Sequence, residues 1–228
     1  MAHAHAFVAD LEHPVLDDTD RHHLERVLRL RAGDEVTVAD GRGGWRVCRF
    51  GPELEPTGSL EHRPSAEPKL TMAFALMKGE RPEWTVQKLT ELGVDEIVPF
   101  VAERSVVRWR DDRADRQLER LRRVAREAAM QSRRAWLPEV TAVTTFTDVA
   151  ARSGAALIDI GGTDRPTLRH RVLLVGPEGG WSDAERDCGL PAVGLGPNVL
   201  RAETAAVAAA SVWSGLRAGI VTEGRVGR

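Results

Sequence analysis

Two glycine-marked segments near the C-terminus constrain the fold of this chain more than any other part of its sequence. The first reads LLVGPEGGWS from Leu173 to Ser182, and the second reads GLGPNVLRAETA from Gly194 to Ala205. Each pattern predicts a buried strand that runs into a tight loop and opens a helix. The first N–H groups of a helix have no intrahelical partner, and glycine lets a ligand approach the main chain closely. Two such junctions, about 15 residues apart, therefore predict a cleft lined by backbone that suits a nucleotide-like cofactor.

The glycine spacing argues against two common nucleotide-binding motifs. The first segment lacks the Lys-Ser/Thr pair of a phosphate-binding P-loop, and it does not follow the G-x-G-x-x-G pattern of dinucleotide-binding folds. One such loop alone is also compatible with a plain turn between a strand and a helix. The occurrence of two favours the ligand-binding interpretation.

The rest of the C-terminal region predicts an α/β domain. Strands are expected at residues 70–77, 96–101, 155–160, 172–175 and 192–195, and helices at 83–92, 113–134 and 203–218. Strands that alternate with helices predict a mostly parallel sheet.

Residues 7–60 predict a small, mostly β unit. Residues 34–40 and 45–50 alternate in polarity, and the glycine-rich turn between them predicts a hairpin of a small barrel. A short helix is expected before this hairpin, with Leu24, Val27 and Leu28 on one face. Several prolines place the boundary between the two parts near residues 61–69.

Composition limits the class of protein further. With 228 residues, 42% of them hydrophobic, the chain is long enough for one large domain or two smaller ones. No apolar run approaches the roughly 20 residues that span a bilayer, and the N-terminus does not resemble a signal peptide. The isolated Cys48 and Cys188 predict no zinc site and are typical of reduced thiols in a cytosolic protein. A disulfide between them is the less favoured alternative.

The basic residues are almost all arginines, whose guanidinium groups suit bidentate contact with phosphate. Biased codon usage would explain the same ratio. The N-terminal unit has a basic edge, as an RNA-binding surface needs, made of Arg26, Arg29 and Arg31 with His22 and His23. In the long helix, a Glu119–Arg123 pair is expected on a solvated face. Near its end, Gln131 and Ser132 offer hydrogen bonds to nucleotide bases, beside the guanidinium groups of Arg133 and Arg134.

Polar residues also stand at two element ends in the C-terminal region. Lys78 and Arg81 follow a strand, where ligand sites collect in α/β sheets, and the nearby Trp84 is expected in the core. Arg201 and Glu203 lie at the mouth of the second glycine segment. Arg201 is a candidate electrostatic partner for an anionic base or a phosphate, and Glu203 a candidate orienting group. Alternatively, Glu203 only complements the helix dipole.

Together these features resemble the bacterial 16S rRNA uridine-N3 methyltransferases, the RsmE family within the SPOUT superfamily, nearly from end to end. The matching segments are residues 22–34, residues 78–94 with KGER at their start, ERSV at 103–106, residues 127–134, GPEGG at 176–180 and LRAETA at 200–205. Each motif alone is moderately specific, but their occurrence in this order is highly specific.

The resemblance implies an α/β fold with two domains. A small β-barrel PUA-like domain at residues 1–66 would bind RNA, and a SPOUT-type methyltransferase domain at 67–228 would contain a parallel sheet and a C-terminal trefoil knot. S-adenosylmethionine would be the cofactor and methyl donor. The enzyme would be a cytoplasmic homodimer that binds neither a metal ion nor a membrane. Its partner would be the 16S rRNA of the small ribosomal subunit, in which it would methylate N3 of a uridine of the decoding region.

The resemblance also implies roles for individual residues. Arg201 would stabilise the uracil anion, and Glu203 would act as a base or orient the substrate. The residues expected to bind the cofactor are Gly176, Pro177, Glu178, Gly179, Gly180, Leu195, Gly196, Val199 and Leu200. The residues expected to bind RNA are His22, His23, Arg26, Arg29, Lys78, Arg81, Arg104, Gln131 and Arg133.

Pro82, Met130, Arg133 and Asn198 depart from the usual family pattern. Because they lie beside the expected sites, these departures affect the roles of individual residues more than the reaction itself.

Two functions other than uridine-N3 methylation stay open. One is a methyltransferase of the same fold that acts on a ribose 2′-O or a tRNA base, and the other is a non-catalytic RNA-binding or ribosome-assembly factor. The N-terminal unit and the motif at 104–106 favour rRNA, and the intact glycine segments argue against loss of catalysis.

Overall fold

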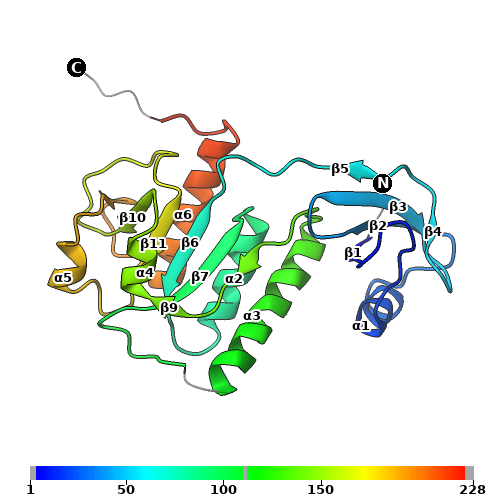
Figure 1. Ribbon diagram of the computed structural model, residues 1–228, viewed down its shortest axis with the longest axis horizontal. Coiled ribbons are helices and arrows are strands. Elements are labelled where there is room, and N and C mark those ends of the chain that lie inside the picture. Colours follow the sequence, from blue (N-terminus) through cyan, green and yellow to red (C-terminus); the bar gives the residue numbers. More distant parts are fainter. Residues whose placement is uncertain (1–3, 110–111, 224–228) are drawn as a thin grey trace. The chain divides into compact units, whose positions relative to one another are not determined.

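A computed structural model describes residues 4–109 and 112–223 of the chain (Figure 1). By its internal contacts the chain divides into two units, Met1–Ser65 with Arg126–Leu137, and Ala66–Ala125 with Pro138–Arg228. The N-terminal unit thus includes a stretch from the middle of the chain.

None of the described helices is long and apolar enough to cross a membrane. Both cysteines are free, so the alternative of a disulfide is wrong.

The N-terminal unit is built on a five-stranded sheet. Its strands are β1 (Ala4–Phe7), β2 (Glu35–Ala39), β3 (Gly44–Arg49), β4 (Glu55–Pro56) and β5 (Glu61–His62). β2 and β3 form the predicted antiparallel hairpin, while β1 pairs with β2 in parallel. β4 and β5 both pair with β3. In the hairpin turn, Gly41 and Gly43 have φ angles of +74° and +99°, a region that glycine enters without steric cost.

The short helix predicted near the N-terminus is only partly correct. α1 (Asp18–His22) continues directly into a π-helical turn, η1 (His23–Val27). A π-helical turn has i→i+5 hydrogen bonds and is wider than an α-helical one, so the α-helical spacing of apolar residues does not predict which of its side chains are buried. Leu24 is fully buried, but Val27 and Leu28 are 61% and 44% exposed. The predicted apolar face of these three residues is therefore wrong.

Residues 126–137 join the N-terminal unit through specific polar contacts. The Arg126 guanidinium donates hydrogen bonds to both carboxylate oxygens of the buried Asp20 and lies 5.9 Å from the centre of the Phe7 ring. The hydrogen bond to Asp20 raises the pKa of Arg126. Nearer the C-terminal end of this segment, the His5 ring hydrogen-bonds to the Arg134 carbonyl oxygen at 3.0 Å.

The C-terminal unit contains a seven-stranded sheet in which all of the strand pairings are parallel, as predicted. Its strands are β6 (Thr71–Ala75), β7 (Glu96–Val101), β8 (Glu139–Val140), β9 (Thr144–Thr145), β10 (Ala155–Ile158), β11 (Val172–Val175) and β12 (Ala192–Val193). Their order is β12-β10-β11-β6-β7-β8, and β9 also pairs with β7. Only β10 separates β11 from β12, so the loops that follow these two strands lie at the same edge of the sheet.

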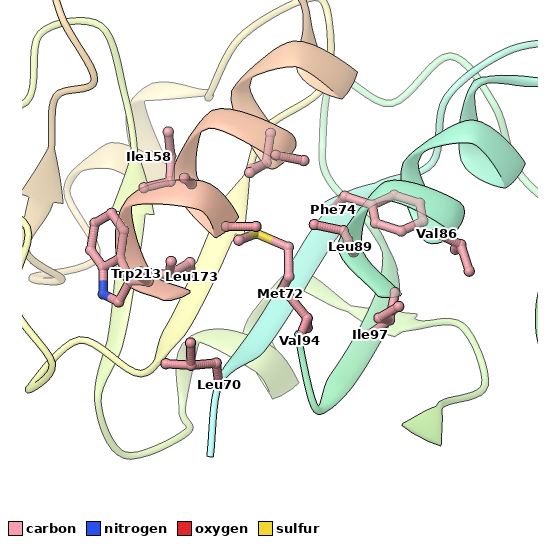
Figure 2. Close-up of a cluster of buried hydrophobic side chains, with 14 of the residues drawn as sticks. Leu70, Met72, Phe74, Val86, Leu89, Val94, Ile97, Ile158, Leu173 and Trp213 are labelled. Carbon is pink, nitrogen blue, oxygen red and sulfur yellow. The ribbon is translucent and has the colours of Figure 1, made fainter. Parts of the chain in front are cut away.

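Helices cover this sheet on both faces. They are α2 (Arg81–Glu91), α3 (Asp112–Gln131), α4 (Phe146–Ala150), α5 (Asp183–Arg186) and α6 (Ala202–Arg217). On one face, Met72 of β6 belongs to a core cluster with Leu89 of α2 and Trp213 of α6 (Figure 2). On the other face, Ala73 belongs to a second cluster with Trp181. This alternation is expected of a strand that is buried on both sides.

Trp84, predicted to be in the core, is 44% exposed. α2 buries Val86 and Leu89 against the sheet, together with Thr85 and Thr90. At about 100° per residue, Trp84 falls on the opposite side of the helix, with the exposed Gln87. The prediction of a core position is therefore wrong.

One face of α3 packs into the core, where Leu121 is fully buried. The predicted ion pair between Glu119 and Arg123 is wrong, because Glu119 pairs with Arg122 at 2.7 Å. The Arg122 Nε group also donates a hydrogen bond to the Val140 carbonyl oxygen at 3.2 Å. That second contact holds Arg122 at the edge of the sheet.

Candidate functional site

The loops that follow β11 and β12 enclose a cavity of about 340 Å³ together with the first turn of α6. This volume falls in the usual range of small-molecule sites. Eight of the nine residues predicted to bind the cofactor line it, namely Gly176, Pro177, Glu178, Gly180, Leu195, Gly196, Val199 and Leu200. The predicted catalytic residue Arg201 lines it too. The order of the strands thus brings the two glycine segments together.

Gly176 allows the first loop to lie against Trp181. A Cβ atom at position 176 would stand 3.0 Å from the indole Cε2, which is tighter than ordinary contact. The Trp181 indole is 1% exposed, stacks on Phe100, and donates a hydrogen bond to the Ile158 carbonyl oxygen at 3.1 Å. The cavity wall is therefore held rigidly at this point.

The second loop presents backbone donors. In the described part of the chain, the N–H groups of Leu195, Gly196, Val199 and Leu200 form no hydrogen bond within the protein. Leu195 is half-buried and the other three residues are exposed, so water or the acceptor atoms of a ligand can pair with these N–H groups. Gly196 has a φ of +130°, which other residues rarely adopt.

The other lining residues fit S-adenosylmethionine, the cofactor that the sequence resemblance implies. Ile158 and Leu195 offer apolar surface to a purine, and Asp159 and Glu178 offer carboxylates to the cationic groups. Arg186, which lies 3.4 Å from Asp159, is a candidate partner for the carboxylate of the cofactor. Sequence reasoning missed Asp159 and Arg186. The position of Asp159 directly after β10 is the one signal that could have found it.

Gly179 and Arg104 lie together beside the cavity. Arg104 Nη1 donates a hydrogen bond to the Trp181 carbonyl oxygen at 2.9 Å and a longer one to the Gly179 carbonyl oxygen at 3.5 Å. A Cβ atom on Gly179 would stand 3.3 Å from the Arg104 Cβ. Gly179 thus lets the loop approach Arg104, and a direct contact of Gly179 with the cofactor stays a prediction.

A wider pocket of about 630 Å³ lies between the starts of α2 and α6. It is lined by Lys78, Gly79, Glu80, Arg81, Trp84, Arg201, Glu203 and Thr204. The pocket brings the predicted catalytic pair, Arg201 and Glu203, together with Lys78 and Arg81, which are predicted to bind RNA. Because Arg201 lines both spaces, the cavity and the pocket share a wall.

Arg81 connects the acidic residues of the two spaces. Its guanidinium lies 2.5 Å from Glu178 Oε1, in the cavity wall, and 4.0 Å from Glu203 Oε2, in the pocket wall. Among the described residues, no group hydrogen-bonds to Glu203 Oε2, although this oxygen is buried. An unsatisfied buried carboxylate oxygen is costly, so it is a strong candidate acceptor for a ligand N–H group or a proton.

The remaining residues predicted to bind RNA lie in the N-terminal unit. They are His22, His23, Arg26, Arg29, Gln131 and Arg133, and all six are exposed. Arg29 and Arg133 have φ angles of +57° and +53°, a left-handed conformation that favours glycine. Contact of these side chains with RNA stays a prediction.

In residues 4–109 and 112–223, no group of three or more His, Cys, Asp or Glu side chains is arranged to hold a metal ion.

Two family models together match residues in both units of the chain. Residues 64–214 match the RNA methyltransferase domain family, and residues 16–51 match the RNA methyltransferase PUA domain family. The first match contains both glycine segments and both spaces described above.

Individual proteins show the same likeness. The chain is 35% identical over 223 residues to the ribosomal RNA small subunit methyltransferase E of Mycobacterium bovis, covering 86% of this chain and 83% of that protein. It is 37% identical over 207 residues to the Synechocystis protein of the same name, and the match covers 81% of this chain and 67% of that protein. The solved structure of the Neisseria gonorrhoeae protein of that name, bound to S-adenosyl methionine, superposes with a TM-score of 0.76 at 28% identity, covering 93% of this chain and 97% of that one.

Proposed function

Because this chain belongs to the ribosomal RNA small subunit methyltransferase E family of S-adenosylmethionine-dependent RNA methyltransferases, we propose that it methylates N3 of a uridine in 16S rRNA. The observation that carries this proposal is that Arg201 lines both the cavity between the two glycine segments and the pocket between α2 and α6. On one side lies a cavity with backbone donors for a nucleoside. On the other lies a pocket with a buried carboxylate oxygen that has no hydrogen-bond partner among the described residues.

The cavity residues would hold the cofactor. When bound there, S-adenosylmethionine supplies an electrophilic methyl group on a sulfonium sulfur. The N–H groups of Leu195, Gly196, Val199 and Leu200 would bind its acceptor atoms. Asp159 and Glu178 would lie near its cationic groups, as charge complementarity requires.

The pocket residues would prepare the acceptor base. Uracil N3 carries a proton and is a poor nucleophile until this proton leaves. Glu203 would accept the proton, so that the electron pair of the N3–H bond stays on N3 and becomes nucleophilic. Arg201 would stabilise the resulting anion, whose charge spreads onto the neighbouring carbonyl oxygens. The base must leave its stack to reach this position.

The N-terminal unit would supply further contacts with rRNA through its exposed basic edge, which includes Arg26 and Arg29. We also propose that the enzyme works in the cytoplasm as a homodimer and that its C-terminal loops form a trefoil knot. Sedimentation of the purified protein at several concentrations tests the dimer. A mass of a single 25.0 kDa chain at all concentrations would exclude it.

A methyl-transfer assay with three acceptors tests the proposed function. Purified protein and methyl-labelled S-adenosylmethionine are incubated with small ribosomal subunits from cells that lack the modification, with large subunits, or with bulk tRNA. We expect transfer to the small subunits alone. Transfer to tRNA would assign the enzyme to a different RNA, and cofactor binding without any transfer would indicate a non-catalytic RNA-binding factor.

A further inference from the structure

Trp84 is a large aromatic side chain that the fold leaves in solvent. It is 44% exposed on the first turn of α2, whereas Trp181 and Trp213 are almost fully buried. An exposed indole loses the stabilisation that burial would give it. Its position also matters, because it forms part of the wall of the pocket between α2 and α6.

The pocket combines the groups that a pyrimidine base would need. Trp84 provides an aromatic surface, Arg201 and Lys78 provide cationic donors, and Glu203 provides a buried carboxylate oxygen that lacks a hydrogen-bond partner among the described residues. A uracil ring has two flat faces, two carbonyl oxygens that accept hydrogen bonds, and one N3–H donor between them. The wall thus offers one complementary group for each of these features.

We propose that this pocket is the acceptor-base subsite and that Trp84 is the platform on which the target uracil stacks. The inference rests on the proposed function and adds a residue to it. Stacking on an aromatic side chain is the usual way in which proteins hold a base that has left its own stack. Here it compensates for the stacking that the base loses in rRNA and holds the ring beside Arg201, at the wall of the cofactor cavity.

The same pocket favours uracil over cytosine. Cytosine has no proton on N3, so its N3 lone pair would face the Glu203 carboxylate and repel it. Its exocyclic amine would also replace a carbonyl oxygen as the partner of a cationic donor. A site that leaves buried polar groups unpaired with the wrong ligand discriminates strongly against it.

Four variants test the platform. Trp84→Ala removes the stacking surface, Trp84→Phe keeps an aromatic ring, and Trp84→Leu keeps apolar bulk without a ring. Gln87→Ala changes an exposed residue on the same helix that does not line the pocket. For each protein, kcat/KM is measured with small ribosomal subunits as the varied acceptor, and the Kd of S-adenosylmethionine is measured by calorimetry.

We expect kcat/KM to fall about 5- to 150-fold in Trp84→Ala and in Trp84→Leu, the range expected for loss of one base stack. Trp84→Phe should recover most of this loss, and Gln87→Ala should match wild type. The Kd of the cofactor should stay within about twofold in all four variants, which also shows that they are folded.

Two results would overturn the inference while the proposed function stands. In one, wild type transfers methyl groups and Trp84→Ala does so equally well. In the other, Trp84→Leu recovers as much activity as Trp84→Phe, so that bulk and not stacking is needed. Wild-type protein that transfers no methyl group to any acceptor would instead overturn the proposed function, and this subsite with it.

Discussion

Acidification from pH 7 to pH 5 should destabilise the N-terminal unit through one residue, His5. The side chain of His5 is 6% exposed and hydrogen-bonds to Thr37 Oγ1 at 2.8 Å and to the Arg134 carbonyl oxygen at 3.0 Å. Burial lowers the pKa of His5 from 6.5 to about 4, although the hydrogen bond to Arg134 partly opposes this shift. At pH 5 the folded protein therefore holds a neutral ring, whereas the unfolded chain binds a proton there.

The direction and size of the effect follow from this difference in pKa. The unfolded state binds the proton more tightly, so the stability contributed by neutral His5 is present above pH 6.5 and is lost as the pH falls toward 4. A pKa difference of about 2.5 units corresponds to a limit of about 3.4 kcal/mol. At pH 5, the loss relative to pH 7 is about 2 kcal/mol.

Urea unfolding of wild type and His5→Gln at several pH values measures this loss. The glutamine amide keeps a donor for the Arg134 carbonyl oxygen but does not titrate. All other ionisable groups are common to both proteins, so their effects cancel in the difference. We expect the free energy of unfolding of wild type, relative to the variant, to fall by about 2 kcal/mol between pH 7 and pH 5. If this difference between wild type and variant changes by less than about 0.5 kcal/mol from pH 7 to pH 5, the reasoning is refuted, because the pKa of His5 would then be the same in the folded and the unfolded protein.

Three further substitutions test other parts of the structure. Arg126→Ala should lower the free energy of unfolding by about 3 kcal/mol in urea, because it leaves the buried Asp20 carboxylate unpaired. Glu203→Gln should lower kcat for methyl transfer about 100-fold or more, with the cofactor Kd within about twofold, if Glu203 accepts the N3 proton. Gly176→Val should abolish calorimetric binding of S-adenosylmethionine, since a Cβ atom there already stands 3.0 Å from the Trp181 ring.

Matched controls exist for two of these changes. Arg123→Ala removes an exposed arginine from the same helix as Arg126 and should cost less than about 0.5 kcal/mol. Gly161→Ala places a Cβ atom 3.7 Å from its nearest neighbour, an ordinary contact, and should leave cofactor binding intact. Equal effects of Arg126→Ala and Arg123→Ala would mean that the buried ion pair contributes nothing. A Gly176→Val protein that binds the cofactor normally would show that this loop is not part of the site.

Five of the seven strands of the C-terminal sheet could be predicted from the sequence, because buried parallel strands appear as continuous apolar runs between turn residues, whereas the two-residue strands β8 and β9 show no such run. β7 and β11 have the bounds that were predicted, residues 96–101 and 172–175. The order of the strands could not be predicted, since no local pattern states that β10 lies between β11 and β12. That order is what brings the two glycine segments together.

Local periodicity failed where tertiary packing decides the outcome. An α-helical pattern could not show that a π-helical turn follows α1 and leaves Val27 exposed. Nor could it show that Arg126 pairs with Asp20, because the two residues are 106 positions apart in the sequence. Trp84 was misassigned because tryptophan is usually buried, whereas here the helix turns it toward a pocket.

Mapping of the methylated atom tests the central claim most directly. Small ribosomal subunits that lack the modification are incubated with the protein and methyl-labelled S-adenosylmethionine. Their rRNA is then digested to nucleosides for mass spectrometry. The arrangement of Arg201 and Glu203 predicts that the label is found in 3-methyluridine and that Glu203→Gln greatly reduces it. Label on a ribose 2′-oxygen, on another base, or in equal amount with the variant would contradict the account.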